Sequence, residues 1–200
     1  MWKQFSLITL TLILFFMGIS MLLPIFTGKP SEVLDATGYE NTSIGKTLPK
    51  MTFEATGLEG KRLTLSDDWK ESAYQVFIFY PMDQTPGCTI QLCVMRESYK
   101  EFKAENIAVA GVNTAPLLSH QAFAGLHKLP FPLLVDKDRQ LAKYFEVREN
   151  VGVNNRTVVV LSAKHGVIWK KEGMPSPQEI LTVIHDNQVI SDNTIPLDKS

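Results

Sequence analysis

The sequence predicts a three-layer α/β sandwich with a mixed β-sheet. Strand-like and helix-like segments alternate from about Leu48 onward, the order expected of a sheet with helices packed on it. The run VFIFY (Val76–Tyr80) is continuously apolar, as in a central strand that is covered on both faces. The alternation ends in a predicted hairpin followed by a helix, so part of the sheet is expected to be antiparallel.

The elements follow from turn signals and from the spacing of apolar residues. Residues 51–65, MTFEATGLEGKRLTL, indicate two short strands joined through the turn signal Glu59-Gly60. From about Cys88 to Glu105 apolar residues recur every three or four positions, which predicts a helix. Next are expected, in chain order, a strand over Ile107–Asn113, a helix over 119–128, a short strand over 131–136 and a helix around Arg139–Phe145.

The C-terminal part is predicted to form a hairpin and a closing helix. The segments TVVVLS (157–162) and GVIWKKEG (166–173) indicate two strands joined by a short turn. The last helix is predicted over 176–187, with Ser176 as its N-cap and Pro177 in the first position. The tail over 188–200 is expected to be irregular.

The first thirty residues differ in composition from the rest. The 22 residues from Phe5 to Phe26 carry no charge, enough for a helix of about 33 Å. A cleaved signal peptide is the alternative, but its apolar stretch is shorter, about 7–15 residues, and the usual A-x-A site is missing. We therefore expect a membrane anchor over 1–28, a polar linker over 29–46 and a domain over 47–187. A short N-terminal stub usually stays in the cytosol, so the domain is expected on the extracytoplasmic (periplasmic) side.

Composition argues against several classes of function. Lys and Arg number 20 against 21 Asp and Glu, and this balance gives no electrostatic case for a nucleic-acid partner. Two cysteines are too few for a disulfide-dense scaffold or a four-cysteine zinc site. His120 and His127 can share one helix face, but no carboxylate of ligand spacing accompanies them. The sequence therefore predicts neither a metal site nor another cofactor.

The candidate chemistry lies in the segment YPMDQTPGCTIQLC. Cys88 stands at the end of a strand-to-helix loop that contains Pro81 and Gly87, and ligands of α/β folds bind beyond such strand ends. At the first turn of a helix, free N–H groups and the helix dipole favour a thiolate, which is both nucleophilic and oxidisable. Cys93 lies inside the predicted helix, where a cysteine can equally be a small core residue.

The spacing of the two cysteines constrains what they can do together. Residues five apart on a regular helix have Cα atoms about 8.6 Å apart, whereas a disulfide requires them within about 7 Å. Cys88 and Cys93 therefore cannot bridge while that turn stays helical, and a redox cycle between them would require local unwinding. The spacing C-x₄-C also differs from the C-x-x-C of thioredoxin-type reductases.

This segment, with its preceding strand, resembles the peroxiredoxins, in particular the Q-type or bacterioferritin-comigratory-protein branch. That branch typically reads F-Y-P-x-x-x-T-P-G-C-T-x-x-x-C, and this chain reads FYPMDQTPGCTIQLC from Phe79 to Cys93. The resemblance continues through LPFPLLVD and NRTVVVL and covers roughly residues 44–184. The chain departs from the branch at Pro49, where Pro-x-Phe becomes Pro-Lys-Met, and at 111–113, where Gly-Val-Ser becomes Gly-Val-Asn.

The resemblance implies a thioredoxin-like fold and a thiol peroxidase that reduces hydrogen peroxide and organic hydroperoxides. It implies that Cys88 is the peroxidatic cysteine and that Cys93 is the resolving cysteine, which forms an intramolecular disulfide with it. Thr85 then supplies a hydroxyl to the peroxide and the thiolate, Arg156 holds the thiolate charged, and Pro81 shields the sulfur. The implied partner is a thioredoxin-like or other thiol reductant. Resolution within one chain favours a monomer.

Two other functions stay open from the sequence. A membrane-tethered thioredoxin-fold metallochaperone, or a thiol–disulfide assembly factor, would use the two cysteines and a histidine, although the C-x₄-C spacing does not favour it. A degenerate peroxiredoxin fold that serves only as a binding domain is disfavoured by the presence of Thr85, Cys88 and Arg156. Tyr80 is interpreted as a packing residue.

Overall fold

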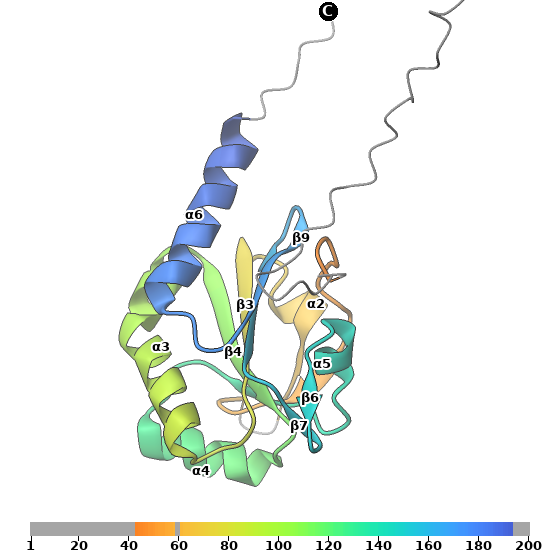
Figure 1. The fold of residues 1–200 in the computed structure, drawn as a ribbon, viewed down its shortest axis with the longest axis vertical. Coiled ribbons are helices and arrows are strands. Elements are labelled where there is room, and N and C mark those ends of the chain that lie inside the picture. The colour runs from red at the N-terminus through yellow and green to blue at the C-terminus, as the bar shows by residue number, and fades with distance from the viewer. Residues whose placement is uncertain (1–42, 59–60, 194–200) are drawn as a thin grey trace, which may run out of the picture. The chain divides into compact units, whose positions relative to one another are not determined.

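The computed structural model describes residues 43–58 and 61–193, and its elements alternate as the sequence predicts (Figure 1). The predicted elements are confirmed, whereas the short helix α2 and the strands β6 and β7 were not predicted. In chain order the elements are β1 (Thr52–Glu54), β2 (Arg62–Thr64), α2 (Leu65–Asp68), β3 (Tyr74–Phe79), α3 (Pro86–Ala104), β4 (Ile107–Asn113), α4 (Leu117–His127), β5 (Leu133–Val135), α5 (Gln140–Tyr144), β6 (Glu149–Asn150), β7 (Val153–Asn154), β8 (Thr157–Ser162), β9 (Gly166–Glu172) and α6 (Pro177–Asn193).

The main sheet has five strands in the order β5-β4-β3-β8-β9. The pairs β3–β4 and β4–β5 are parallel, whereas β3–β8 and β8–β9 are antiparallel. The continuously apolar strand β3 is therefore central, as predicted, and every one of its residues is buried. The mixed sheet expected from the closing hairpin is also confirmed.

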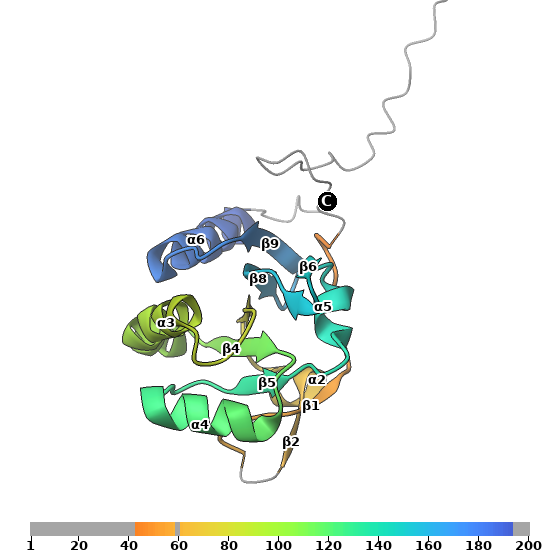
Figure 2. The same cartoon turned by 60° about the horizontal axis from the view of Figure 1, so that its bottom comes forward.

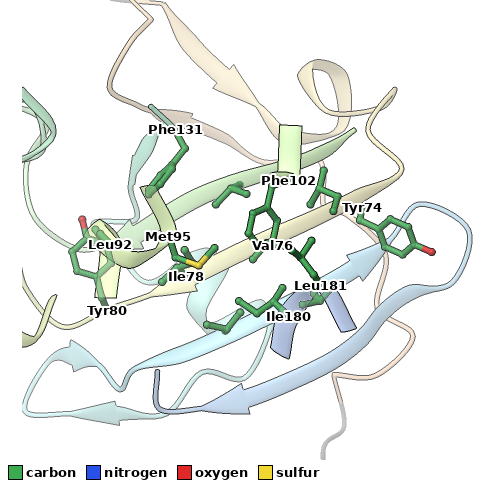
Figure 3. Close-up of a cluster of buried hydrophobic side chains, with 14 of the residues drawn as sticks. Tyr74, Val76, Ile78, Tyr80, Leu92, Met95, Phe102, Phe131, Ile180 and Leu181 are labelled. Atoms are coloured by element: carbon green, nitrogen blue, oxygen red, sulfur yellow. The ribbon is translucent and has the colours of Figure 1, made fainter. Parts of the chain in front are cut away.

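The sheet is covered on both faces, which gives the three layers predicted from the sequence. Alternate side chains of β3 point to opposite faces. Val76 and Ile78 join a cluster with residues of α3, α4 and α6, shown in part in Figure 3. Phe77 and Phe79 join a second cluster with β1, β2, α2 and α5. Figure 2 shows α3, α4 and α6 on one side of the sheet and α2 and α5 on the other.

The described end of the predicted linker pairs with the sheet. Gly45 N donates to Val167 O, and Val167 N donates to Lys46 O, both at 2.8 Å. Gly166, next to this pairing, has φ +70°, and a Cβ atom there would lie 2.5 Å from the Gly45 carbonyl oxygen. Residues 43–46 thus belong to the folded domain, rather than to a linker that reaches residue 46. The backbone approach also requires glycine at position 166.

The last helix is longer than the sequence predicted. Ser176 is the N-cap as expected, since its Oγ accepts a hydrogen bond from Glu179 N at 3.1 Å. The helix continues past Asn187 to Asn193, where an irregular tail was predicted. Tyr74 Oη donates to Asn187 Oδ1 at 3.1 Å, which ties this part of the helix to β3. The prediction failed because the final turns expose apolar side chains, so the amphipathic pattern ends before the helix does.

Several predictions fall on parts of the chain that the structure does not describe. The anchor over 1–28, most of the linker and the turn Glu59-Gly60 lie outside the described residues. Among residues 43–58 and 61–193, no helix is both long and apolar enough to cross a membrane.

The β6–β7 hairpin contains a strained turn and gives a first prediction. Val151 and Gly152 both have positive φ, +49° and +79°, and Val151 is 95% exposed. Such two-residue turns favour Asn-Gly, and a β-branched residue is disfavoured there. Val151→Asn is therefore expected to stabilise the fold by about 1 kcal/mol, measured by thermal unfolding. Val151→Thr, which keeps the β-branch, should give no gain; equal gains in both variants would refute this explanation.

Candidate active site

Cys88 lies in the first turn of α3, directly after the loop that leaves the central strand. Thr85 is the N-cap with extended backbone (φ −80°, ψ 147°), and Pro86 opens the helix, as proline favours. Cys88 is fully buried. The predicted start of this helix is confirmed, and it places the sulfur where unpaired helix N–H groups and the dipole favour negative charge.

Arg156, the residue before β8, contacts the sulfur of Cys88 although the two residues are 68 positions apart in the sequence. Its Nη1 donates to Cys88 Sγ at 3.3 Å and to Gln91 Oε1 at 3.1 Å. The register of the sheet explains the meeting, because Phe79 at the end of β3 pairs with Thr157 at the start of β8. The loop that follows β3 and the residue that precedes β8 therefore lie at the same end of these two neighbouring strands. An arginine is charged at all accessible pH values, so it stabilises an anionic sulfur here.

Gly87 makes room for this contact. A Cβ atom at position 87 would lie 2.6 Å from Arg156 Nη2, closer than real Cβ atoms approach other heavy atoms. The backbone of Gly87 has no unusual φ, so the glycine matters here for space: a side chain at this position would displace the Arg156 guanidinium. The sequence showed this glycine as part of a loop; the structure shows that the guanidinium takes the place of its side chain.

Gln91 is a site residue that the sequence analysis missed. It lies one turn after Cys88 on α3, is 6% exposed, and accepts a hydrogen bond from Arg156. Its Nε2 has no hydrogen-bond partner within the described part of the chain. A polar residue three positions after the cysteine was the available signal, because positions i and i+3 share a helix face.

The remaining predicted site residues lie in the same loop and helix as Cys88. Thr85 is half-buried, and its Oγ1 donates to Met82 O at 3.4 Å. Pro81 is half-buried at the start of the loop. Cys93 is half-buried within α3, and both cysteines are free thiols. Since α3 runs without interruption from Pro86 to Ala104, the two cysteines lie on one regular helix.

The loop before Cys88 also carries a buried carboxylate. Tyr80 packs in the core, with its ring centroid 6.3 Å from that of Phe123, but its hydroxyl also donates to Asp83 Oδ1 at 2.9 Å. Burial and the Asp83 carboxylate raise the pKa of Tyr80 well above its ordinary value, so it stays a donor. Burial acts to raise the pKa of Asp83, but hydrogen bonds from His120 and Ser119 outweigh it and lower that pKa to about 2.

His120 has a carboxylate neighbour in space that the spacing of residues in the sequence did not indicate. Asp83 lies 3.0 Å from His120 Nδ1, although the two residues are 37 positions apart in the sequence. Sequence spacing could not show this contact, since the fold brings the start of α4 beside the loop after β3. Within the described residues, no group of three or more His, Cys, Asp or Glu side chains is arranged to hold a metal ion.

Comparison with known proteins assigns the chain to a family. The AhpC/TSA family matches residues 44–170. Peroxiredoxin Q of Populus jackii is 38% identical over 158 residues, which are 79% of this chain and 67% of that protein. Peroxiredoxin Bcp of Bacillus subtilis (strain 168) is 34% identical over 125 residues, 58% of this chain and 77% of that protein. The chain belongs to the peroxiredoxin Q/Bcp family.

Solved structures agree on the fold of this peroxiredoxin. Enterococcus faecalis AhpC matches with a TM-score of 0.69 at 21% identity, covering 78% of this chain and 98% of that one. A cysteine-to-serine mutant of Xanthomonas campestris peroxiredoxin Q matches with a TM-score of 0.62 at 23% identity, covering 75% and 99%. At such identities these likenesses show the fold alone, and they confirm the expected thioredoxin-like α/β architecture with a mixed sheet.

Family membership settles the broad activity. Peroxiredoxins are thiol peroxidases, so the family implies a peroxide as substrate and a thiol as reductant. The relatives do not favour the metallochaperone alternative. The roles of individual residues require an argument from this chain's own geometry.

Proposed function

We propose that this peroxiredoxin reduces hydrogen peroxide and organic hydroperoxides with Cys88 as the peroxidatic cysteine and Cys93 as the resolving cysteine. The observation that carries the proposal is the 3.3 Å contact between Arg156 Nη1 and the buried sulfur of Cys88. A buried thiolate is costly unless it is paired and hydrogen-bonded. The guanidinium and the start of α3 supply both conditions for Cys88.

In the first step the Cys88 thiolate attacks the terminal oxygen of the peroxide. An S–O bond forms and the O–O bond breaks, which leaves Cys88 as a sulfenic acid and releases an alkoxide or hydroxide that takes up a proton. Negative charge moves from sulfur to the departing oxygen. Arg156 can stabilise the negative charge on the sulfur and then on the departing oxygen, and Thr85 has a hydroxyl at the start of the helix. Both residues are therefore proposed to orient the peroxide. Pro81 is proposed to shield the sulfur from bulk water.

In the second step Cys93 resolves the sulfenic acid. The Cys93 sulfur attacks the Cys88 sulfur, an S–S bond forms, and the hydroxyl group leaves as water with a proton from the Cys93 thiol. Two positions five apart on one helix exceed disulfide reach, so the first turn of α3 must unwind for this step. A thioredoxin-like or other dithiol then reduces the disulfide, and the turn can re-form.

The proposal also covers the membrane anchoring, orientation and oligomeric state of the enzyme. The uncharged stretch from Phe5 to Phe26 supports a membrane anchor over 1–28, with the domain on the extracytoplasmic side. Resolution within one chain requires no second subunit, which supports a monomer. Protease protection in sealed vesicles would test the orientation, and the mass of the detergent-solubilised protein in solution would test the monomer.

A single-turnover experiment tests the two cysteine roles. The full-length protein, reduced and held in mild detergent, is mixed with one equivalent of hydrogen peroxide and followed by intact mass. The parent should lose two hydrogens as the disulfide forms, whereas Cys93→Ser should gain one oxygen and retain it. Oxidation of the parent no faster than that of an ordinary exposed thiol would contradict the proposal. A stable oxygen adduct in the parent would contradict the role of Cys93.

A further inference from the structure

The buried carboxylate of Asp83 has no part in the chemistry described above, yet it lies five residues before Cys88. Asp83 is 7% exposed and stands in the loop between β3 and α3. Its two oxygens accept hydrogen bonds from four side chains, an arrangement that we name the Asp83 hub. The four donors are Tyr80 Oη at 2.9 Å, Asn113 Nδ2 at 3.0 Å, Ser119 Oγ at 2.6 Å and His120 Nδ1 at 3.0 Å.

The hub places a buried histidine against the carboxylate. His120 is fully buried, and its second ring nitrogen, Nε2, lies 3.2 Å from the carbonyl oxygen of Leu134. Nδ1 of His120 therefore faces a carboxylate and Nε2 faces a carbonyl oxygen, and both of these groups can only accept hydrogen bonds. Charge-assisted hydrogen bonds of this kind are stronger than neutral ones.

The hub ties a loop to three fixed parts of the fold. Tyr80 follows β3 directly, Asn113 ends β4, and Ser119 and His120 lie in the first turn of α4. β4 and α4 lie beside the loop that leads into α3 (Figure 2). Asn113 is also one of the positions at which this chain departs from the usual Gly-Val-Ser, and its amide supplies one of the four donors. Asp83 is thus the point at which the loop before Cys88 is fixed.

The position of Asp83 matters for the unwinding of α3 that the proposed catalytic cycle requires. Cys88 must be helical to meet Arg156, and it must leave the helix to reach Cys93. The segment that unwinds begins at Pro86, three residues after Asp83. We propose that Asp83 is a positioning residue: through the hub it holds the loop in the form that starts α3 at Pro86, and so favours the helical over the unwound state. This inference rests on the proposed function of Cys88 and Cys93.

The two chemical steps should respond to the hub in opposite directions. An intact hub keeps Cys88 beside Arg156, which speeds attack on the peroxide, and it delays unwinding, which slows disulfide formation. The delay exposes the sulfenic acid to a second peroxide. In that side reaction the sulfenate sulfur takes another oxygen, the second O–O bond breaks, and a sulfinic acid forms with release of an alcohol or water. A weakened hub should therefore lower susceptibility to overoxidation.

Two variants and one matched control test the inference. Asp83→Asn removes the charge of the hub, and Ser119→Ala removes only the 2.6 Å hydrogen bond from a half-buried side chain. Leu141→Ala, in the cluster on the opposite face of the sheet, lowers stability without touching the loop. Each full-length protein, in mild detergent, is mixed rapidly with hydrogen peroxide, quenched, and read by intact mass. One oxygen marks the sulfenic acid, two oxygens the sulfinic acid, and loss of two hydrogens the disulfide.

For Asp83→Asn we expect the rate constant of Cys88 oxidation to fall about 10-fold and that of disulfide formation to rise about 5-fold. For Ser119→Ala we expect changes of about 3-fold in the same directions, smaller than those of Asp83→Asn because the other three hydrogen bonds to the carboxylate remain. The yield of sulfinic acid at high peroxide concentration should be lower in both variants than in the parent. Leu141→Ala should leave both rate constants equal to those of the parent within experimental error.

The outcomes separate this inference from the function on which it rests. If the parent protein oxidises no faster than an exposed thiol, the proposed function itself fails. If the parent is fast but both hub variants keep its two rate constants, or change them in the same direction, only the role of Asp83 fails. Opposite changes in Leu141→Ala as well would show a general effect of stability and would also overturn the inference. Should Asp83→Asn not fold, Ser119→Ala alone decides the question.

Discussion

Cys88→Ser is expected to abolish peroxide reduction, with a fall in rate of about 10⁴-fold or more, the scale on which removal of a catalytic nucleophile acts. A serine hydroxyl is not ionised near neutral pH and is a weak nucleophile unless a neighbouring base activates it. Serine nearly matches cysteine in size, so the fold should be preserved. Peroxide consumption in the presence of a dithiol, with the unfolding temperature as a check on folding, measures the effect.

The matched control for this variant is Cys93→Ser, which keeps the nucleophile. It should retain rapid oxidation of Cys88 in a single turnover but lose the disulfide. Equal loss in both variants would argue that the two cysteines act only as a pair, for instance in metal binding. Unchanged peroxide consumption in Cys88→Ser would show that the proposed mechanism is wrong.

Arg156→Met is expected to lower the rate constant of Cys88 oxidation by about 10²–10³-fold, as removal of one preorganised donor does elsewhere. Methionine keeps much of the arginine's length but loses the charge and the hydrogen bonds to Cys88 Sγ and Gln91 Oε1. Without the guanidinium, an anionic sulfur at this position loses the charge that stabilises it. The rate constant of Cys88 oxidation in a single turnover, with the unfolding temperature as a check on folding, measures the effect.

Gln91→Leu is a milder variant of the same contact and should have a smaller effect than Arg156→Met. It removes one acceptor of Arg156 but keeps the charge, so a loss of about 10-fold in the rate constant of Cys88 oxidation is expected. Stability should change little, because the buried Nε2 of Gln91 has no partner within the described residues. An Arg156→Met protein that oxidises as fast as the parent would remove the main support for the proposed site.

The sequence predicted those parts of the fold and site that depend on local pattern. The apolar run of β3, the period of α3 and the closing hairpin each determine one element, so the mixed sheet could be predicted before the structure. The motif around Cys88 indicated a reactive thiol, and its resemblance to peroxiredoxins singled out Arg156, 68 residues away. The structure then brought these two side chains into contact.

The parts that sequence could not predict depend on contacts between distant segments. Asp83 and His120 are in contact only because β4 and α4 pack beside the loop after β3. No residue near either of them in the sequence indicates this contact. The two-residue strands β6 and β7 are too short for any alternation to appear. In the sequence Gln91 looks like an ordinary polar residue of a helix, and only the structure shows its hydrogen bond with Arg156.

The burial of the Cys88 sulfur has a practical consequence for thiol labelling. Cys88 has no exposed surface, whereas Cys93 is only half-buried. A small peroxide needs little room, but a maleimide or an iodoacetamide must bring a bulky group to the sulfur it alkylates. In the reduced protein such reagents should therefore modify Cys93 first. Proteome-wide surveys that rank cysteines by alkylation would then report Cys93 as the reactive thiol and overlook Cys88, the residue proposed to react with the peroxide.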